Sequence, residues 1–269
     1  KLSIKDFTEV IAMSPDMPLT YETRAMSYLR AGMLIAALND LDKAIEIDPL
    51  RSSAWNRRGI VNQDLGRYAQ AESDFKKAAE LNNTLDAWYY NKGREFSAAE
   101  NHKEAIVQYS KAIEINPRYI MALNSRGVAF AKLGSWEKAI ENYTAALAID
   151  PNDFVMYRNR CNSWLELDFV DQAIADCEKA VELNPDDFGS YSNGARAYMA
   201  NKDYTKSVSY LSRLIEMEPD DTDLYVLRGI ANQKANDEQA ACLDWRHARA
   251  SGEDDAADLM YRYCIPSDI

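Results

Sequence analysis

Prolines recur in this chain at one fixed interval of 34 residues. Asn83 occupies the one slot on this grid that lacks a proline, and the others hold Pro15, Pro49, Pro117, Pro151, Pro185 and Pro219. The segments that lead into them are close copies, as "DKAIEIDPL" at 42–50 and "SKAIEINPR" at 110–118 illustrate. A period of about 20–50 residues is typical of chains built from stacked repeats, in which no repeat buries its apolar side alone.

Two columns of the grid predict pairs of closely packed helices. With repeats starting at 18, 52, 86, 120, 154, 188 and 222, the eighth position is always small: Ala25, Gly59, Gly93, Gly127, Cys161, Ala195 and Gly229. The twenty-fourth position belongs to a bulkier column: Leu41, Phe75, Tyr109, Tyr143, Cys177, Leu211 and Trp245. Apolar residues also recur at the helical spacing within each half-repeat. Small residues let two antiparallel helices approach while larger neighbours fill the space beside them.

The ends of these helices carry their own signals. Gly32, Gly66 and Gly134 lie where the first helix of a repeat must end, and glycine suits a left-handed C-terminal cap. The residue before each grid proline is pushed out of helical geometry, so the second helix is expected to end there.

These columns resemble the signature of the tetratricopeptide repeat (TPR) family. The resemblance covers residues 18–255 as seven consecutive repeats and implies an all-α fold, a right-handed α-solenoid of helix-turn-helix repeats. Residues 1–17 are expected to hold the second helix of a truncated repeat, and residues 256–269 a short capping helix. We therefore expect a single TPR solenoid over residues 1–269.

Arginine dominates the seventh position of the repeats. Each repeat with aspartate at the twenty-third position also has arginine at the seventh: Arg24 with Asp40, Arg58 with Asp74, Arg160 with Asp176, and Arg228 with Asp244. The sixth repeat has lost both, with Gly194 and Tyr210 in their places. This joint presence and loss predicts a structural ion pair or hydrogen bond between the two helices of a repeat.

The four cysteines fall into two groups. Cys161 and Cys177 replace a small and a large core residue of one repeat, so both are expected to be buried thiols. Cys242 and Cys264 lie in an ending that resembles the terminal segment of many bacterial TPR proteins thought to work in the cell envelope. A disulfide between them would fasten the capping helix and imply an oxidising compartment. Two independent thiols remain the alternative, because spacing does not settle connectivity.

Composition argues against several classes of function. The formal net charge of −12 disfavours a nucleic-acid binder, which normally has a basic face. No apolar run approaches the roughly 20 residues of a membrane helix, so direct membrane insertion is not expected. His102 and His247 lie in different repeats, and there is no glycine-rich phosphate loop. We expect no enzymatic activity, no cofactor and no metal. The chain starts at Lys1 with no signal-peptide pattern, and we expect it to be a piece of something longer.

Candidate binding residues follow from the TPR resemblance. In that family the first helices line a concave groove, and partners usually bind there. Positions five, six and nine of the repeats hold mostly amide and arginine side chains here: Asn56, Arg57, Tyr90, Asn91, Arg94, Asn124, Arg158, Asn159, Asn162, Asn193 and Arg196. Asparagine offers a donor and an acceptor to a peptide backbone, and arginine a rigid fork to carboxylates. Ordinary solvated polar groups are the alternative interpretation.

The groove between the fifth and sixth repeats is the strongest candidate. Five residues are expected to converge there: Arg158, Asn159, Asn162, Asn193 and Arg196. TPR domains that bind chaperone tails grip a C-terminal carboxylate with a particular set of basic residues and asparagines. Arg158, Asn162 and Asn193 match the first three slots of that set, whereas Asp223 and Leu227 do not fit the last two. A complete clamp for such tails is therefore not expected.

The combined prediction is a protein-interaction scaffold that binds an extended peptide or a partner's surface segment, with acidic groups favoured. Two other functions remain open. The chain could be the regulatory or substrate-docking arm of an enzyme whose catalytic domain lies upstream, or a self-association module that forms a homo-oligomer through its solenoid ends. The resemblance implies the bacterial cell envelope as the favoured location, with the cytoplasm as the alternative.

Overall fold

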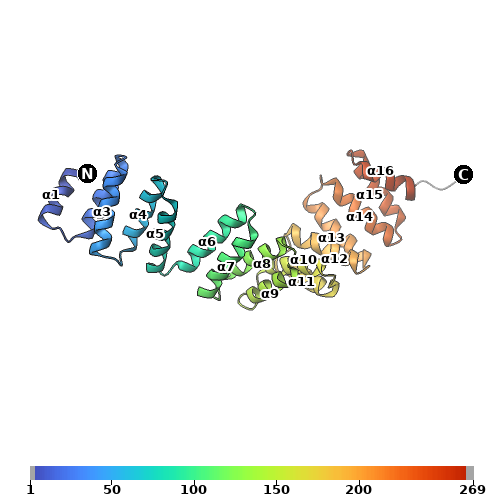
Figure 1. The fold of residues 1–269 in the computed structure, drawn as a ribbon. Helices are drawn as coiled ribbons and strands as arrows, with labels where there is room; N and C mark the ends of the chain where they lie inside the picture. Colours follow the sequence, from blue (N-terminus) through green and yellow to red (C-terminus); the bar gives the residue numbers. More distant parts are fainter. Residues whose placement is uncertain (1–3, 265–269) are drawn as a thin grey trace. The chain divides into compact units, whose positions relative to one another are not determined.

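The computed structural model describes residues 4–264, and in that range it contains sixteen α-helices and no β-strand (Figure 1). The helices are α1 (Ile4–Met13), α2 (Pro18–Arg30), α3 (Leu34–Ile47), α4 (Ser52–Asp64), α5 (Tyr68–Leu81), α6 (Leu85–Ala98), α7 (His102–Ile115), α8 (Ile120–Lys132), α9 (Trp136–Leu147), α10 (Phe154–Glu166), α11 (Val170–Leu183), α12 (Phe188–Ala200), α13 (Tyr204–Met217), α14 (Thr222–Lys234), α15 (Glu238–Ala250) and α16 (Asp254–Tyr263). The predicted all-α helical repeat solenoid is confirmed. None of the helices in the described range is long and apolar enough to cross a membrane.

The chain forms two compact units. The first comprises the residues up to Glu95 together with Val107–Pro117, and it holds α1 to α5, most of α6 and the second half of α7. The second comprises Phe96–Ile106 and the residues from Arg118 onward, and it holds the remainder.

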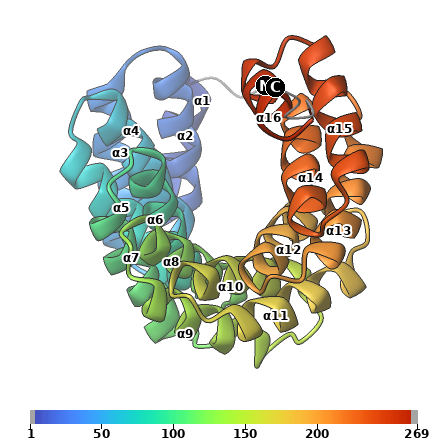
Figure 2. The same cartoon turned by 90° about the vertical axis from the view of Figure 1, so that its right-hand side faces the viewer.

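Consecutive helices pair within each unit as the repeat grid predicts. In the first unit α2 packs on α3 and α4 on α5, and in the second α8 packs on α9, α10 on α11, α12 on α13, and α14 on α15. The helix α1 packs on α2, and α16 packs on α15. In the second unit α10, α12 and α14 lie along the concave side, and α11, α13 and α15 lie outside them (Figure 2).

The small eighth position of a repeat lies against the bulky twenty-fourth. A Cβ atom added to Gly127 would lie 2.6 Å from Cε1 of Tyr143, and one added to Gly59 would lie 2.6 Å from Cε1 of Phe75. Both distances are shorter than real Cβ contacts. The predicted close approach of the paired helices is therefore confirmed, and the absence of a side chain on one helix makes room for the aromatic ring of the other.

The turn inside each repeat uses a left-handed backbone conformation at the fifteenth position. Glycine supplies it in three repeats, with φ of 73° at Gly32, 72° at Gly66 and 71° at Gly134. In the other repeats a residue with a side chain adopts φ between 57° and 63°: Glu100, Asp168, Lys202 and Asn236. The prediction of left-handed caps at the three glycines is confirmed, and the structure extends it to positions where glycine is absent.

The predicted arginine–aspartate pairs are confirmed. Arg160 donates from Nε and Nη2 to the two carboxylate oxygens of Asp176, at 2.7 Å each. The same two-pronged contact joins three other pairs: Arg24 with Asp40, Arg58 with Asp74, and Arg228 with Asp244. All four carboxylates are buried. The hydrogen bonds to Asp176 raise the pKa of Arg160, so the pair stays charged. The charged pair holds the two helices of the repeat in contact.

The prediction of buried thiols at Cys161 and Cys177 is wrong. The two residues are buried, but they form a disulfide between α10 and α11, with Cα atoms 5.6 Å apart. They occupy the eighth and twenty-fourth positions, which face each other in every repeat, so two cysteines there come within bonding distance. Cys242 and Cys264 also form a disulfide, which fastens α16 to α15. For this second pair the disulfide alternative is the one the structure adopts.

Candidate functional site

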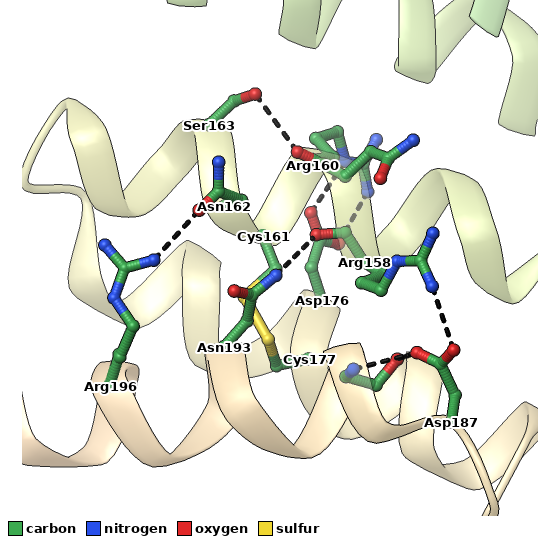
Figure 3. Close-up of a disulfide and its surroundings, with 12 residues drawn as sticks. Arg158, Arg160, Cys161, Asn162, Ser163, Asp176, Cys177, Asp187, Asn193 and Arg196 are labelled. Atoms are coloured by element: carbon green, nitrogen blue, oxygen red, sulfur yellow. Dashed lines mark hydrogen bonds and ion pairs between the residues drawn. A yellow bond between two sulfur atoms is a disulfide. The ribbon is translucent and has the colours of Figure 1, made fainter. Parts of the chain in front are cut away.

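Five of the predicted site residues come together on the concave side of the second unit. Arg158, Asn159 and Asn162 lie on α10, and Asn193 and Arg196 lie on the neighbouring α12. Figure 3 shows Asn162 and Asn193 between Arg158 and Arg196, which lie at opposite ends of the group. Equivalent positions on α10 and α12 are one repeat apart, so corresponding turns of the two helices lie side by side. This packing brings the five side chains together, as predicted.

Side chains at the sixth position bind the preceding repeat. Asn159 donates from Nδ2 to Oδ1 of Asn124 at 3.1 Å, and Asn193 donates from Nδ2 to the backbone oxygen of Arg158 at 3.3 Å. Each bond joins the sixth position of one repeat to the fifth position of the repeat before it. These asparagines therefore connect neighbouring first helices and keep only part of their hydrogen-bonding capacity for a ligand.

The two arginines have carboxylate partners within the chain. Nη1 of Arg158 donates to Oδ1 of Asp187 at 2.8 Å, and Asp187 also caps the first turn of α12. Arg196 donates to Oδ1 of Asn162 at 3.0 Å and to Oε1 of Glu166 at 3.1 Å. Both arginine charges are thus offset locally, which weakens the attraction for acidic ligands that the sequence had predicted for them.

A hollow of about 260 Å³ opens between α8, α9, α10 and α12. Three predicted residues line it: Asn159, Asn162 and Asn193. The other principal walls are Val128, Lys132 and Trp136, none of which was predicted from the sequence. Val128 is an apolar member of the ninth column, in which only the polar residues were predicted to bind, and Lys132 occupies the thirteenth position of the fourth repeat. Buried Tyr143 also lines the hollow, and burial raises the pKa of its phenol.

The predicted residues of the first unit lie in different surroundings. Asn56 and Asn91 line a larger hollow of about 850 Å³, whose other walls include Tyr68, Phe75 and Trp88. Tyr90 packs on the ring of Tyr109, with centroids 5.9 Å apart, and Arg94 is exposed.

Arg57 is engaged with the fully buried carboxylate of Glu22. Its Nη1 lies 3.5 Å from Oε2 of Glu22. The same Oε2 accepts a 2.9 Å hydrogen bond from Ser53, and Oε1 binds Arg51. Glu22 is the acidic residue at the fifth position of the first repeat. Arg57 therefore compensates a buried charge and is not a free recognition group.

The helix α14 lacks the basic residues that would complete a chaperone-tail clamp. On α14, Asp223 and Leu227 are both exposed, and they offer a carboxylate and an apolar side chain where the clamp needs basic groups. The matching residues Arg158, Asn162 and Asn193 all have partners within the chain.

Comparison with known families supports the same repeat register. Models of the tetratricopeptide repeat match residues 52–85, 120–153 and 189–221, and a TPR repeat model matches residues 93–134. Two of these matches begin at predicted repeat starts, residues 52 and 120.

Two solved bacterial proteins share the fold. Residues 41 to the end of MamA from Desulfovibrio magneticus RS-1 give a TM-score of 0.59 at 18% identity, over 62% of this chain and 94% of that one. The C-terminal part of a TPR repeat-containing protein from Cytophaga hutchinsonii gives 0.59 at 19% identity, over 82% of this chain and 91% of that one. Both likenesses concern the fold.

A curated relative matches a shorter stretch. Hsp70-Hsp90 organizing protein 2 from Arabidopsis thaliana is 32% identical over 66 residues, which is 24% of this chain. The chain spans 12% of the length of that protein. The matched repeats, the paired helices and the regular spacing of their contacts agree, and the chain is a TPR repeat protein.

Proposed function

We propose that this protein-interaction scaffold binds an extended peptide on the concave side of its second unit, across α8, α10 and α12. The observation that carries the proposal is the convergence of three amide side chains, Asn159, Asn162 and Asn193, on one hollow. An extended peptide presents its own N–H and C=O groups along its length, and these need partners of both kinds when water is displaced.

The hydrogen bonds within the chain leave a mixed set of groups for such a ligand. Asn159 and Asn193 each donate one Nδ2–H to the preceding repeat. These hydrogen bonds leave the Oδ1 atoms of both residues as acceptors for a ligand. Asn162 uses its Oδ1 to accept from Arg196, so its Nδ2 can donate. A surface with acceptors on two repeats and a donor between them suits the alternating groups of a peptide backbone.

The affinity of such a site is expected to be modest. Ordering a flexible peptide offsets much of the contact free energy, so we expect dissociation constants on the order of micromolar. Because Arg158 and Arg196 already bind Asp187 and Glu166, their share in recognising acidic groups is expected to be small.

The test is selection of peptides from a displayed random library on the whole chain, followed by titration of the enriched peptides. Replacing Asn162 and Asn193 together by Ala should weaken their binding about tenfold or more while the melting curve keeps its shape. Asn152, an exposed loop asparagine, supplies the control variant Asn152→Ala, which should bind normally. Failure to enrich any peptide, or equal binding by the folded double variant, would contradict the proposed function.

A further inference from the structure

We propose that the hollow between α8, α9, α10 and α12 is an anchor pocket for one apolar side chain, and that Lys132 binds a carboxylate beside that side chain on the same peptide. The inference rests on the proposed function and adds the chemical class of ligand. The predicted partner is an extended segment with an apolar residue next to an acidic one.

The walls of the hollow suit an apolar side chain. Val128 and Ala131 come from α8, and the rings of Trp136 and Tyr143 come from α9. The volume of about 260 Å³ lies below the roughly 300–1,000 Å³ of pockets that enclose whole small ligands. The hollow therefore fits one side chain of a longer ligand. The three asparagines that line it can form hydrogen bonds with the backbone of that ligand.

The charge at this site comes from Lys132. Its side chain is exposed and lines the hollow, and no ion pair involves it among residues 4–264. In contrast, Arg158 is paired with Asp187, and Arg196 with Glu166. Glu166 occupies the position of Lys132 in the next repeat, and Glu166 forms its ion pair with Arg196. The ammonium of Lys132 is thus the cation at this hollow that remains available to a ligand.

An available cation matters because the chain as a whole is acidic. With a formal net charge of −12, long-range attraction does not favour an acidic ligand. At physiological ionic strength, however, charges separated by more than about 8 Å are largely screened. A carboxylate seated against Lys132 would respond mainly to that ammonium, and the apolar anchor next to it would provide the remaining contact free energy.

The experiment compares library selection and titration across matched variants. Lys132→Glu reverses the charge at the pocket, and Lys234→Glu makes the same change at the same repeat position on α14. Val128→Trp fills the hollow from the exposed surface of α8. Wild type should enrich peptides with an adjacent apolar–acidic pair. Lys132→Glu should weaken their binding at least about tenfold, and Lys234→Glu should leave it within about twofold. Val128→Trp should also weaken it.

A charge-reversed peptide completes the design. Changing the acidic residue of an enriched peptide to lysine should abolish binding to wild type and restore it to Lys132→Glu. Melting curves confirm that each variant is folded. If peptides are enriched but lack the apolar–acidic pair, or bind Lys132→Glu as well as wild type, the anchor-pocket inference is overturned while the proposed function stands. If no peptide is enriched, both fail.

Discussion

Arg160 and Asp176 join α10 to α11 through two hydrogen bonds of 2.7 Å, and the same contact recurs in three other repeats. The Asp176 carboxylate is buried, and the Arg160 side chain is only 18% exposed. Removing one member of such a pair leaves an uncompensated charge in a poorly solvated place. This arrangement leads directly to a stability prediction.

Asp176→Ala should lower the free energy of unfolding by about 3–5 kcal/mol, as expected when one partner of a buried ion pair is lost. Urea titration measures the change. The control is Lys179→Ala, which removes the exposed ion pair with Glu182 on the same helix and should cost at most about 1 kcal/mol. Equal losses in the two variants would mean that the Arg160–Asp176 pair has no special structural role.

Gly127→Leu should destabilise the second unit by about 1–3 kcal/mol, because even a Cβ there would lie 2.6 Å from the ring of Tyr143. Thermal melting measures the effect. Adding Tyr143→Leu should recover part of the loss, since the smaller side chain leaves room for the new one. A single variant that melts like wild type would show that these two helices do not approach as closely as described.

Reduction of the Cys161–Cys177 disulfide should lower the free energy of unfolding by about 3 kcal/mol, as expected for a loop of this length. The paired change Cys161→Gly with Cys177→Tyr reproduces the contact found at Gly127 and Tyr143. It should yield a repeat whose stability is insensitive to reductant. Both proteins are compared with Cys242 and Cys264 replaced by Ser, so that the second disulfide does not contribute. A free energy of unfolding that reductant leaves unchanged in the protein that keeps Cys161 and Cys177 would contradict this prediction.

Glu178 should titrate below its ordinary pKa. Hydrogen bonds from Tyr198 first, and then from Lys206, favour its charged form and lower its pKa. A lowered folded-state pKa stabilises the protein above the ordinary carboxyl value, and this contribution is lost as the pH falls through the folded-state pKa. Tyr198→Phe should move the pKa upward, as measured by NMR titration of the Glu178 carboxyl. Tyr204→Phe serves as the control and should leave it in place.

Amide hydrogen exchange should be fast in α1 and slow in α10 and α11. The helix α1 has no buried residue and packs on α2, whereas α10 and α11 contact helices on both sides and share a disulfide. Opening of α1 therefore breaks few contacts. Uniform protection across these three helices is the result that would refute this prediction.

Most of the fold could be predicted from the sequence because the deciding signals are local and repeated. Helix boundaries follow from glycine at the turn, from proline after the second helix, and from apolar spacing over a few residues. The Arg160–Asp176 contact could also be predicted, because every repeat with aspartate at the twenty-third position has arginine at the seventh, and the sixth repeat has lost both.

Tertiary structure decided the partners of the site residues. Arg158 can reach several groups from α10, and it binds Asp187, a residue 29 positions away at the start of α12. The disulfide between Cys161 and Cys177 likewise depends on how closely α10 and α11 approach. The hollow beside Lys132 is bounded by four helices from three repeats, so no one segment of sequence describes it. Short-range patterns determine which residues form helices. Which side chains meet depends on the packing between helices, because each flexible side chain has several possible partners within reach and only the assembled neighbours select among them.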